Sequence, residues 1–318
     1  MWDFPIGTGA TLVLRTFPFL LIRAAIYFGI AAAFVVSARG GAGIGWTMGA
    51  LGGLTGRAPG AFWGAIGGLA FVGVILWWLR EFLLYLVKAA HIAAMVRNAK
   101  AAPAGFGQVG HALSIVQSRF REAGILLAAG QLVQGTISTL IEKADVATFF
   151  LPAGLRLPSA PANAILKATL HFLGEVVFAR PLGAASKNSW RETRDALTLL
   201  AQNQIVLLRQ ATLIAAAAYG LGFVVFIIAL IPASALADAF PGGPGAITIL
   251  FALIFAWSFK QALIEPFQIA LMIEEVSRVT KGQSPDPDWD AHLTEVSADF
   301  REIKARAVPR GTRPSRYA

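Results

Sequence analysis

The chain contains no cysteine, and charged residues are scarce. Without cysteine it can form neither disulfide bridges nor cysteine metal sites, and thiol usage gives no indication of the redox compartment. Asp, Glu, Lys and Arg make up 14% of the 318 residues, whereas soluble domains carry roughly 25%. So little charge cannot cover a water-exposed surface, which excludes an ordinary soluble domain.

Hydrophobic residues are abundant instead: they form 56% of the chain, and its mean hydropathy is +0.63. They occur in runs of about 20 residues, the length that crosses a ~30 Å hydrocarbon core. The first run contains Arg23 and has no evident small-residue cleavage site, so we expect a retained membrane helix. Abundant Ala and Gly, with Arg exceeding Lys, suggest a GC-rich bacterial genome. The expected location is therefore the bacterial inner membrane, with several crossings.

The pattern of runs predicts an all-α fold, a polytopic membrane helical bundle of about six transmembrane helices with amphipathic interfacial helices. The second run is too long for one crossing at 1.5 Å per residue, so it must tilt, bend or continue into the cytoplasm. An amphipathic segment, 109–120, precedes the third crossing. The expected spans are 17–37, 61–97, 123–141, 164–179, 205–231 and 246–273.

The distribution of basic residues predicts that both termini are cytoplasmic. In that orientation most of the 27 Lys and Arg residues lie on the cytoplasmic side, as the positive-inside rule requires. The exceptions are Arg39, Arg57, Lys143 and Arg156, which would face outward, and Lys167 and Lys260, which would lie at membrane depth. The net charge of +9 then reflects cytoplasmic loops near anionic lipid. We expect membrane lipid, and no nucleic acid, as a partner.

Glycines recur every four residues in the segment 40–73, on both sides of Pro59. Such glycines share one helix face and allow another backbone to approach closely. The pattern favours a tightly packed helix hairpin; a contact in a homo-oligomer or a membrane protein complex is the alternative. Whether 41–56 forms an extra or re-entrant helix stays open. The glycines are Gly41, Gly45, Gly49, Gly53, Gly60, Gly64 and Gly68.

The composition changes after residue 280, which predicts two parts: a transmembrane bundle over 1–280 and a cytoplasmic part over 281–318. A Pro- and Asp-rich turn at 285–288 precedes an amphipathic helix at 289–306, and a basic, disordered tail is expected after it. The tail either stays solvated near anionic headgroups or forms a specific partner site.

Ionisable residues inside the apolar helices are the candidates for function, because charge in hydrocarbon is costly and is normally turned inward. Carboxylates beside aromatic faces suit an organic cation. Glu81, Glu175 and Glu265 would then line one polar path. In the alternative, charges pair internally, for example along the ladder Lys167, His171 and Glu175. The candidate substrate-binding residues are Trp78, Glu81, His171, Glu175, Trp257 and Glu265.

Signals for catalysis are weak. The four histidines are scattered, and the chain contains no H-E-x-x-H, G-x-S-x-G or P-loop motif. His171 and Glu175, four residues apart, could both bind a metal, but two ligands do not make a site. We therefore expect no enzyme, no metal and no cofactor.

The segment 194–203 (RDALTLLAQN) is similar to a basic-Asp-Ala, apolar-run, Asn motif of the choline transporter-like family. Glu265, followed by an apolar run and the turn at 280–285 (TKGQSP), resembles that family's glutamate and N-D-G-S-P-like turn. Trp78 and Glu81 match its W-x-x-E. Family members have more helices and a cysteine-rich outer region, and the chain also resembles bacterial six-helix membrane domains of unknown function.

The resemblance implies that the protein binds or transports a small, cationic solute. The alternative is a non-catalytic membrane subunit or scaffold that assembles with a partner complex. In that case the Gly-rich helices and the basic tail would form the contact surfaces.

Overall fold

In the computed structural model of the protein, the regular elements are helices throughout the described residues, which confirms the all-α prediction. Those residues are 5–79, 84–98, 105–119, 123–143, 169, 172–184, 188–238 and 245–308. The α-helices are α1 (Ile6–Arg15), α2 (Phe17–Gly49), α3 (Arg57–Leu79), α4 (Tyr85–Asn98), α5 (Gly107–Arg119), α6 (Ala123–Lys143), α9 (Ala179–Gly183), α10 (Ser189–Gln202), α11 (Gln204–Ala237), α12 (Ala246–Phe259), α13 (Glu265–Val279), α14 (Pro287–Val296) and α15 (Ala298–Ala307).

Four helical segments are long and apolar enough to cross a membrane: Phe17–Gly52, Arg57–Trp77, Gln204–Ala237 and Ile247–Val279. They correspond to the first, second, fifth and sixth expected spans. The third expected span falls on α6, which is not among these four. The fourth, 164–179, lies partly outside the described residues, which include 169 and 172–179. The structure thus supports a membrane protein with several apolar helices, and a count of six crossings stays a prediction.

The chain divides into two compact units. Unit 1 comprises Met1–Pro18, Tyr85–Ala216 and Phe267–Ala318, and unit 2 comprises Phe19–Leu84 and Ala217–Pro266. This division differs from the expected boundary at residue 281. The described residues after 281 belong to unit 1 because α14 and α15 pack against α10, and α15 also packs against α6.

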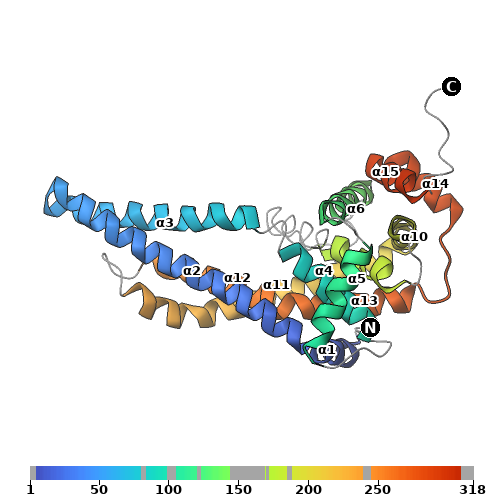
Figure 1. Ribbon diagram of the computed structural model, residues 1–318, viewed down its shortest axis with the longest axis horizontal. Coiled ribbons are helices and arrows are strands. Elements are labelled where there is room, and N and C mark those ends of the chain that lie inside the picture. Colours follow the sequence, from blue (N-terminus) through green and yellow to red (C-terminus); the bar gives the residue numbers. More distant parts are fainter. Residues whose placement is uncertain are drawn as a thin grey trace, which may run out of the picture. The chain divides into compact units, whose positions relative to one another are not determined.

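Unit 2 contains α3, most of α2, the C-terminal part of α11, and α12 (Figure 1). Its core consists mainly of alanines contributed by all four helices, with one large side chain, Phe251. A methyl group is the smallest side chain after glycine, so these helices can approach closely where lipid offers little apolar driving force. The core alanines are Ala38, Ala42, Ala61, Ala65, Ala229, Ala233 and Ala252.

The segment 41–56 forms no extra or re-entrant helix. Helix α2 does not end at residue 37, where the first expected span ends, but continues to Gly49, and two short 3-10 turns, Ala50–Gly52 and Leu54–Gly56, reverse the chain. Gly53 lies between them with φ of 87°, a conformation that glycine adopts without strain. A glycine that would end a helix in water is tolerated in a membrane helix, where the backbone has no water to bond instead.

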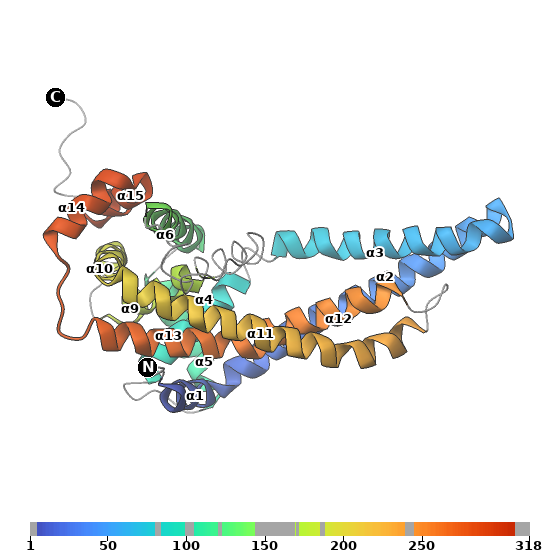
Figure 2. The same ribbon diagram turned by 180° about the vertical axis from the view of Figure 1, so that it is seen from behind.

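In unit 1, the expected amphipathic helix 289–306 is two helices, α14 and α15 (Figure 2). The break is at Ser297, whose Oγ accepts a hydrogen bond from the Phe300 backbone N–H at 3.2 Å, as an N-cap does. Leu293, Phe300 and Ile303 are completely buried. The apolar face of this segment therefore packs inside unit 1.

Candidate functional site

Of the candidate substrate-binding residues, Glu175 lies in unit 1, and Trp257 and Glu265 lie in unit 2. Glu81 and His171 lie outside the described residues. Trp78 belongs to α3, and its side chain is likewise not described. The expected path through three glutamates therefore stays a prediction.

Glu265 is paired with a buried arginine. Arg23 of α2 has 1% of its surface exposed, and its Nη2 donates a hydrogen bond to the Glu265 carboxylate, whose side chain is 8% exposed. From the sequence, Arg23 was expected only as a residue of the first membrane helix. The signal that could have identified it is a guanidinium within an apolar span, which normally requires a partner.

Arg23 also binds an irregular turn in the sixth apolar segment. Between α12 and α13, residues Lys260–Ile264 form a π-helical turn, in which the Glu265 N–H donates to the Lys260 carbonyl. In this register the next donor would be residue 266, which is proline and has no N–H. The Gln261 carbonyl thus lacks its helical donor. Arg23 replaces it, donating from Nε at 3.1 Å and from Nη2 at 2.5 Å.

Aromatic rings lie next to two cations of unit 2, Arg23 and Lys260. The Tyr27 ring lies 5.8 Å from the Arg23 guanidinium and meets Trp257 edge-on, at 5.5 Å between ring centroids. The Lys260 ammonium lies 4.9 Å from the Tyr219 ring. Cation–π contacts are thus present here, and the cations belong to the protein itself.

Glu175 in unit 1 also has a cation partner. Lys88 of α4 donates to Glu175 Oε1 at 2.8 Å, and the two side chains are 11% and 4% exposed. This pair joins two segments far apart in sequence; Lys167, the expected partner along the same helix, lies outside the described residues. Tyr85, one turn before Lys88, is half-buried. Its burial, and secondly the charge of Glu175, raises the pKa of the Tyr85 hydroxyl, against an opposing effect of Lys88.

These arrangements serve packing more directly than solute binding. Desolvated carboxylates attract a ligand cation strongly only while their charge is unbalanced, and Arg23 and Lys88 balance both. Removing one partner of such a pair leaves a buried charge uncompensated. Glu175 and Glu265 are therefore best explained as residues that hold helices together.

The glycine hairpin is the third candidate region. Gly41, Gly45 and Gly49 of α2 lie so close to the opposing segment that a methyl group on any of them would collide with its backbone. The opposing glycines are Gly64, Gly60 and Gly56, of which Gly56 was not among those predicted. Gly68 meets the backbone of Ser37, whose Oγ donates to the Gly68 carbonyl at 2.8 Å. Gly53 makes no such contact, because it lies in the turn.

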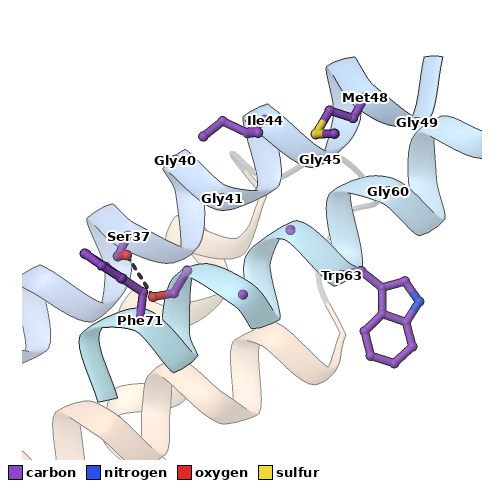
Figure 3. A pocket seen from close by; sticks show the side chains of 13 residues that line it. Ser37, Gly40, Gly41, Ile44, Gly45, Met48, Gly49, Gly60, Trp63 and Phe71 are labelled. Carbon is purple, nitrogen blue, oxygen red and sulfur yellow. Dashed lines mark hydrogen bonds between the residues drawn. The ribbon is translucent and has the colours of Figure 1, made fainter. Parts of the chain in front are cut away.

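An open groove of about 630 Å³ runs along this hairpin (Figure 3). Gly40 and Gly67 also line it, yet a methyl group at either position would meet nothing within 4 Å. Packing inside the chain explains the glycines at 41, 45 and 64 but does not explain these two. The groove is bordered by four large apolar side chains, each 65–68% exposed: Ile44, Met48, Trp63 and Phe71.

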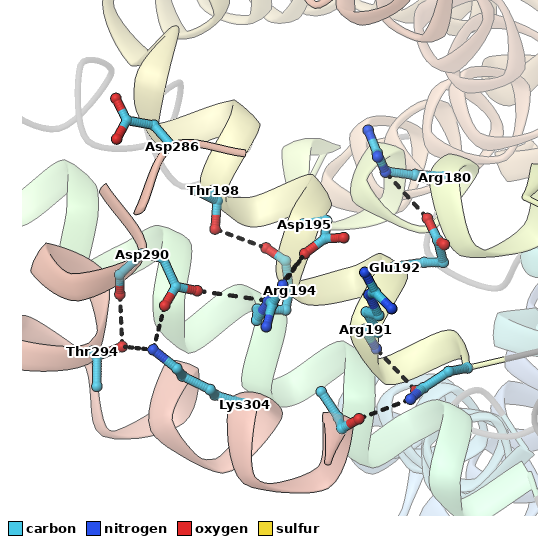
Figure 4. Close-up of polar contacts among 12 residues, drawn as sticks. Arg180, Arg191, Glu192, Arg194, Asp195, Thr198, Asp286, Asp290, Thr294 and Lys304 are labelled. Atoms are coloured by element: carbon cyan, nitrogen blue, oxygen red, sulfur yellow. Dashed lines mark hydrogen bonds and ion pairs between the residues drawn. The ribbon is translucent and has the colours of Figure 1, made fainter. Parts of the chain in front are cut away.

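The two segments that carry the family resemblance interlock in unit 1. Asn203 Nδ2 donates to Gln283 Oε1 at 2.7 Å, and the Asp286 N–H donates to Gln202 Oε1 at 3.0 Å. Close by, Lys304 of α15 and Arg194 of α10 both pair with Asp290 of α14 (Figure 4). These contacts attach the C-terminal helices to α10.

Within the described residues, no group of three or more His, Asp or Glu side chains is placed to hold a metal ion. Comparison of the chain with protein-family models, with curated proteins and with solved structures finds no match. The resemblance to the choline transporter-like family thus rests on the sequence motifs alone.

Proposed function

We propose that the chain is a non-catalytic scaffold of the bacterial inner membrane whose copies associate through the groove of the α2–α3 hairpin. The observation that supports this proposal is the pair Gly40 and Gly67, which keep the groove open although no contact inside the chain requires glycine there. In hydrocarbon, small residues on a helix surface allow a second helix to pack closely.

The occupant that we propose for the groove is a second copy of the chain. One face of the hairpin carries both a depression, formed by glycines, and projecting side chains such as Trp63 and Phe71. A twofold axis can place the projections of each copy into the depression of the other, which is the self-complementarity that an isologous dimer needs.

The topology that accompanies this proposal has four crossings, with both termini cytoplasmic. The outer segments 50–56 and 238–245 then contain no Lys or Arg, and Arg57, which begins α3, is the basic residue next to them, so the positive-inside rule favours this orientation. Six crossings would instead place Lys143 and Arg156 outside and Lys167 at membrane depth. Helix α6 is also unlike a lipid-facing span, because its Gly135 lies against the carboxylate of Asp299 on α15.

Cysteine cross-linking tests the association, because the chain has no cysteine of its own. Gly40→Cys should form covalent dimers with a short bifunctional maleimide in native membranes. Gly43→Cys is the matched control, since Gly43 is equally open but does not line the groove. Adding Gly67→Leu to Gly40→Cys should abolish the dimer, whereas adding Gly73→Leu should preserve it.

Equal cross-linking at positions 40 and 43 would contradict a specific interface. If Gly40→Cys is instead cross-linked to a different protein in stoichiometric amount, the groove binds that protein and the proposal of a second copy is wrong. A Cβ atom added at Gly40, Gly43, Gly67 or Gly73 would meet no other part of the chain within 4 Å, so we expect these variants to keep the hairpin.

Transport of a small cation is the competing hypothesis, and it predicts uptake into liposomes that Glu265→Gln abolishes. Normal uptake by that variant would show that the cation does not need Glu265 to cross the membrane. Absence of uptake by the unsubstituted protein would favour the scaffold.

A further inference from the structure

Unit 1 contains a cavity of about 470 Å³, within the range of about 300–1,000 Å³ that is typical of small-molecule sites. Residues of α4, α9, α10 and α13 line it, together with Leu12 of α1 and two valines just before α9. None of the residues discussed above as candidate substrate-binding residues belongs to this lining.

Most of the wall is aliphatic, and small side chains keep the space open. Ala196 of α10 and Ala184 are the small residues of the lining. Gly183 in α9 packs directly against Val96 of α4, with which an added methyl group would collide. The aliphatic part of the wall comprises Leu12, Met95, Val96, Val176, Val177, Leu199, Leu200, Ile273 and Val276.

The charged groups of the lining are two carboxylates and one guanidinium. Arg180 donates to Glu192 at 3.3 Å, so these two charges balance (Figure 4). Glu274 of α13 has no hydrogen-bond or ion-pair partner among the described residues, although it is only partly exposed. The lining thus carries one unbalanced negative charge, and it also includes the hydroxyl groups of Ser277 and Thr280.

This combination selects among cations. A quaternary ammonium group cannot donate hydrogen bonds and is normally held by aromatic faces, but no aromatic side chain is among the residues that line this cavity. A primary ammonium group has three N–H donors, which carboxylate and hydroxyl oxygens can accept. The aliphatic wall requires an apolar remainder of the ligand.

We infer that this cavity binds an aliphatic primary amine, with its ammonium group at Glu274 and its hydrocarbon chain along the valines and leucines. The ammonium group can belong to a free alkylamine or to the headgroup of an aminophospholipid. The site is separate from the glycine groove, so it is independent of the proposed association.

The test uses the full-length protein in nanodiscs of phosphatidylcholine, which has no primary amine. Equilibrium dialysis with radiolabelled hexylamine, corrected with empty nanodiscs, should show saturable binding. Glu274→Gln, which keeps the shape of the side chain, should weaken this binding at least tenfold. Glu295→Gln removes the same charge from an exposed site on α14 and should leave the affinity unchanged.

Two related probes test the chemistry. Hexyltrimethylammonium should bind at least tenfold more weakly than hexylamine, and hexanoate should not bind. If phosphatidylethanolamine in the nanodisc competes with hexylamine, the lipid headgroup is a source of the ammonium group and the site is supported. Ala196→Phe, which fills the cavity, should remove binding.

Three results would overturn the inference: equal affinity of Glu274→Gln and Glu295→Gln, binding of hexanoate as tight as that of hexylamine, or no binding beyond that of empty nanodiscs. Because Glu274→Gln changes a partly exposed side chain without altering its volume, loss of binding in that variant can be separated from misfolding by its unchanged thermal unfolding.

Discussion

Arg23 and Glu265 are 242 residues apart in the chain, and their ion pair is almost completely buried in unit 2. The same guanidinium supplies the hydrogen bonds that the Gln261 carbonyl loses because residue 266 is proline. The Arg23 side chain therefore both neutralises the Glu265 carboxylate and donates the hydrogen bonds that the Gln261 carbonyl needs. This dual role explains how a π-helical turn next to a proline persists in an apolar segment.

Arg23→Met should therefore destabilise the protein strongly, because it leaves both the Glu265 charge and the Gln261 carbonyl without this donor. Loss of one partner of a buried ion pair costs about 3–5 kcal/mol. The double variant Arg23→Met with Glu265→Gln should recover part of that loss. The free energy of unfolding in mild detergent should be measured for the single and the double variant. A single variant as stable as the unsubstituted protein would mean that the pair does not hold α2 to the π-helical turn.

The parts of the fold that depend on local patterns could be predicted from the sequence. Runs of apolar residues identified the all-helical class and the four segments now seen as candidate spans. The four-residue spacing of glycines located a hairpin, although Gly53 proved to be its turn and Gly56 was missed. The first span was expected to end at residue 37, whereas α2 continues to Gly49, because glycines are tolerated in a helix where a membrane removes the competing hydrogen bonds of water.

The pairing of charges could not be predicted, because it depends on tertiary contacts. Glu175 has Lys88 as a neighbour only because α4 packs beside it, and no periodicity within one helix reveals that. The aliphatic cavity of unit 1 was missed for the same reason. Its lining comes from five separate segments, and each of these looks like an ordinary apolar helix face.

Phe300→Ala should lower the stability of unit 1 as a whole. Its side chain is completely buried on α15, which packs against α10 and α6, and removing a buried phenyl ring costs about 3–5 kcal/mol. Glu302→Ala on the same helix is the control, since an exposed pair with Arg306 contributes only about 0.3–0.5 kcal/mol. Hydrogen exchange should show reduced protection in α10 and α6 for Phe300→Ala. Loss of protection confined to α14 and α15 would instead support the separate C-terminal part expected from the sequence.

Stability at alkaline pH should depend on Tyr85. Its pKa in the folded protein lies above the ordinary value of 10.0, so the folded state keeps the hydroxyl proton after the unfolded chain has lost it. The unfolded state then binds fewer protons, and the free energy of unfolding falls as the pH rises above 10, by up to about 1.4 kcal/mol per pH unit. Tyr85→Phe lacks this contribution and should lose stability less steeply. Denaturant unfolding between pH 8 and 11 would measure the slopes, and parallel curves would contradict the assigned burial.

Labelling of single cysteines should distinguish four crossings from six, and the absence of native cysteine gives a clean background. Thr55→Cys lies in the turn between α2 and α3 and should react with a membrane-impermeant maleimide from outside the cell in both topologies. Ser284→Cys, in the exposed segment before α14, should react only after the membrane is opened. The decisive position is Lys143, at the end of α6. Four crossings place Lys143→Cys on the same side as Ser284→Cys, because the whole segment between α3 and α11 then stays in the cytoplasm. Labelling of Lys143→Cys in intact cells, at the rate of Thr55→Cys, would show that α6 crosses the membrane and would restore the six-helix topology.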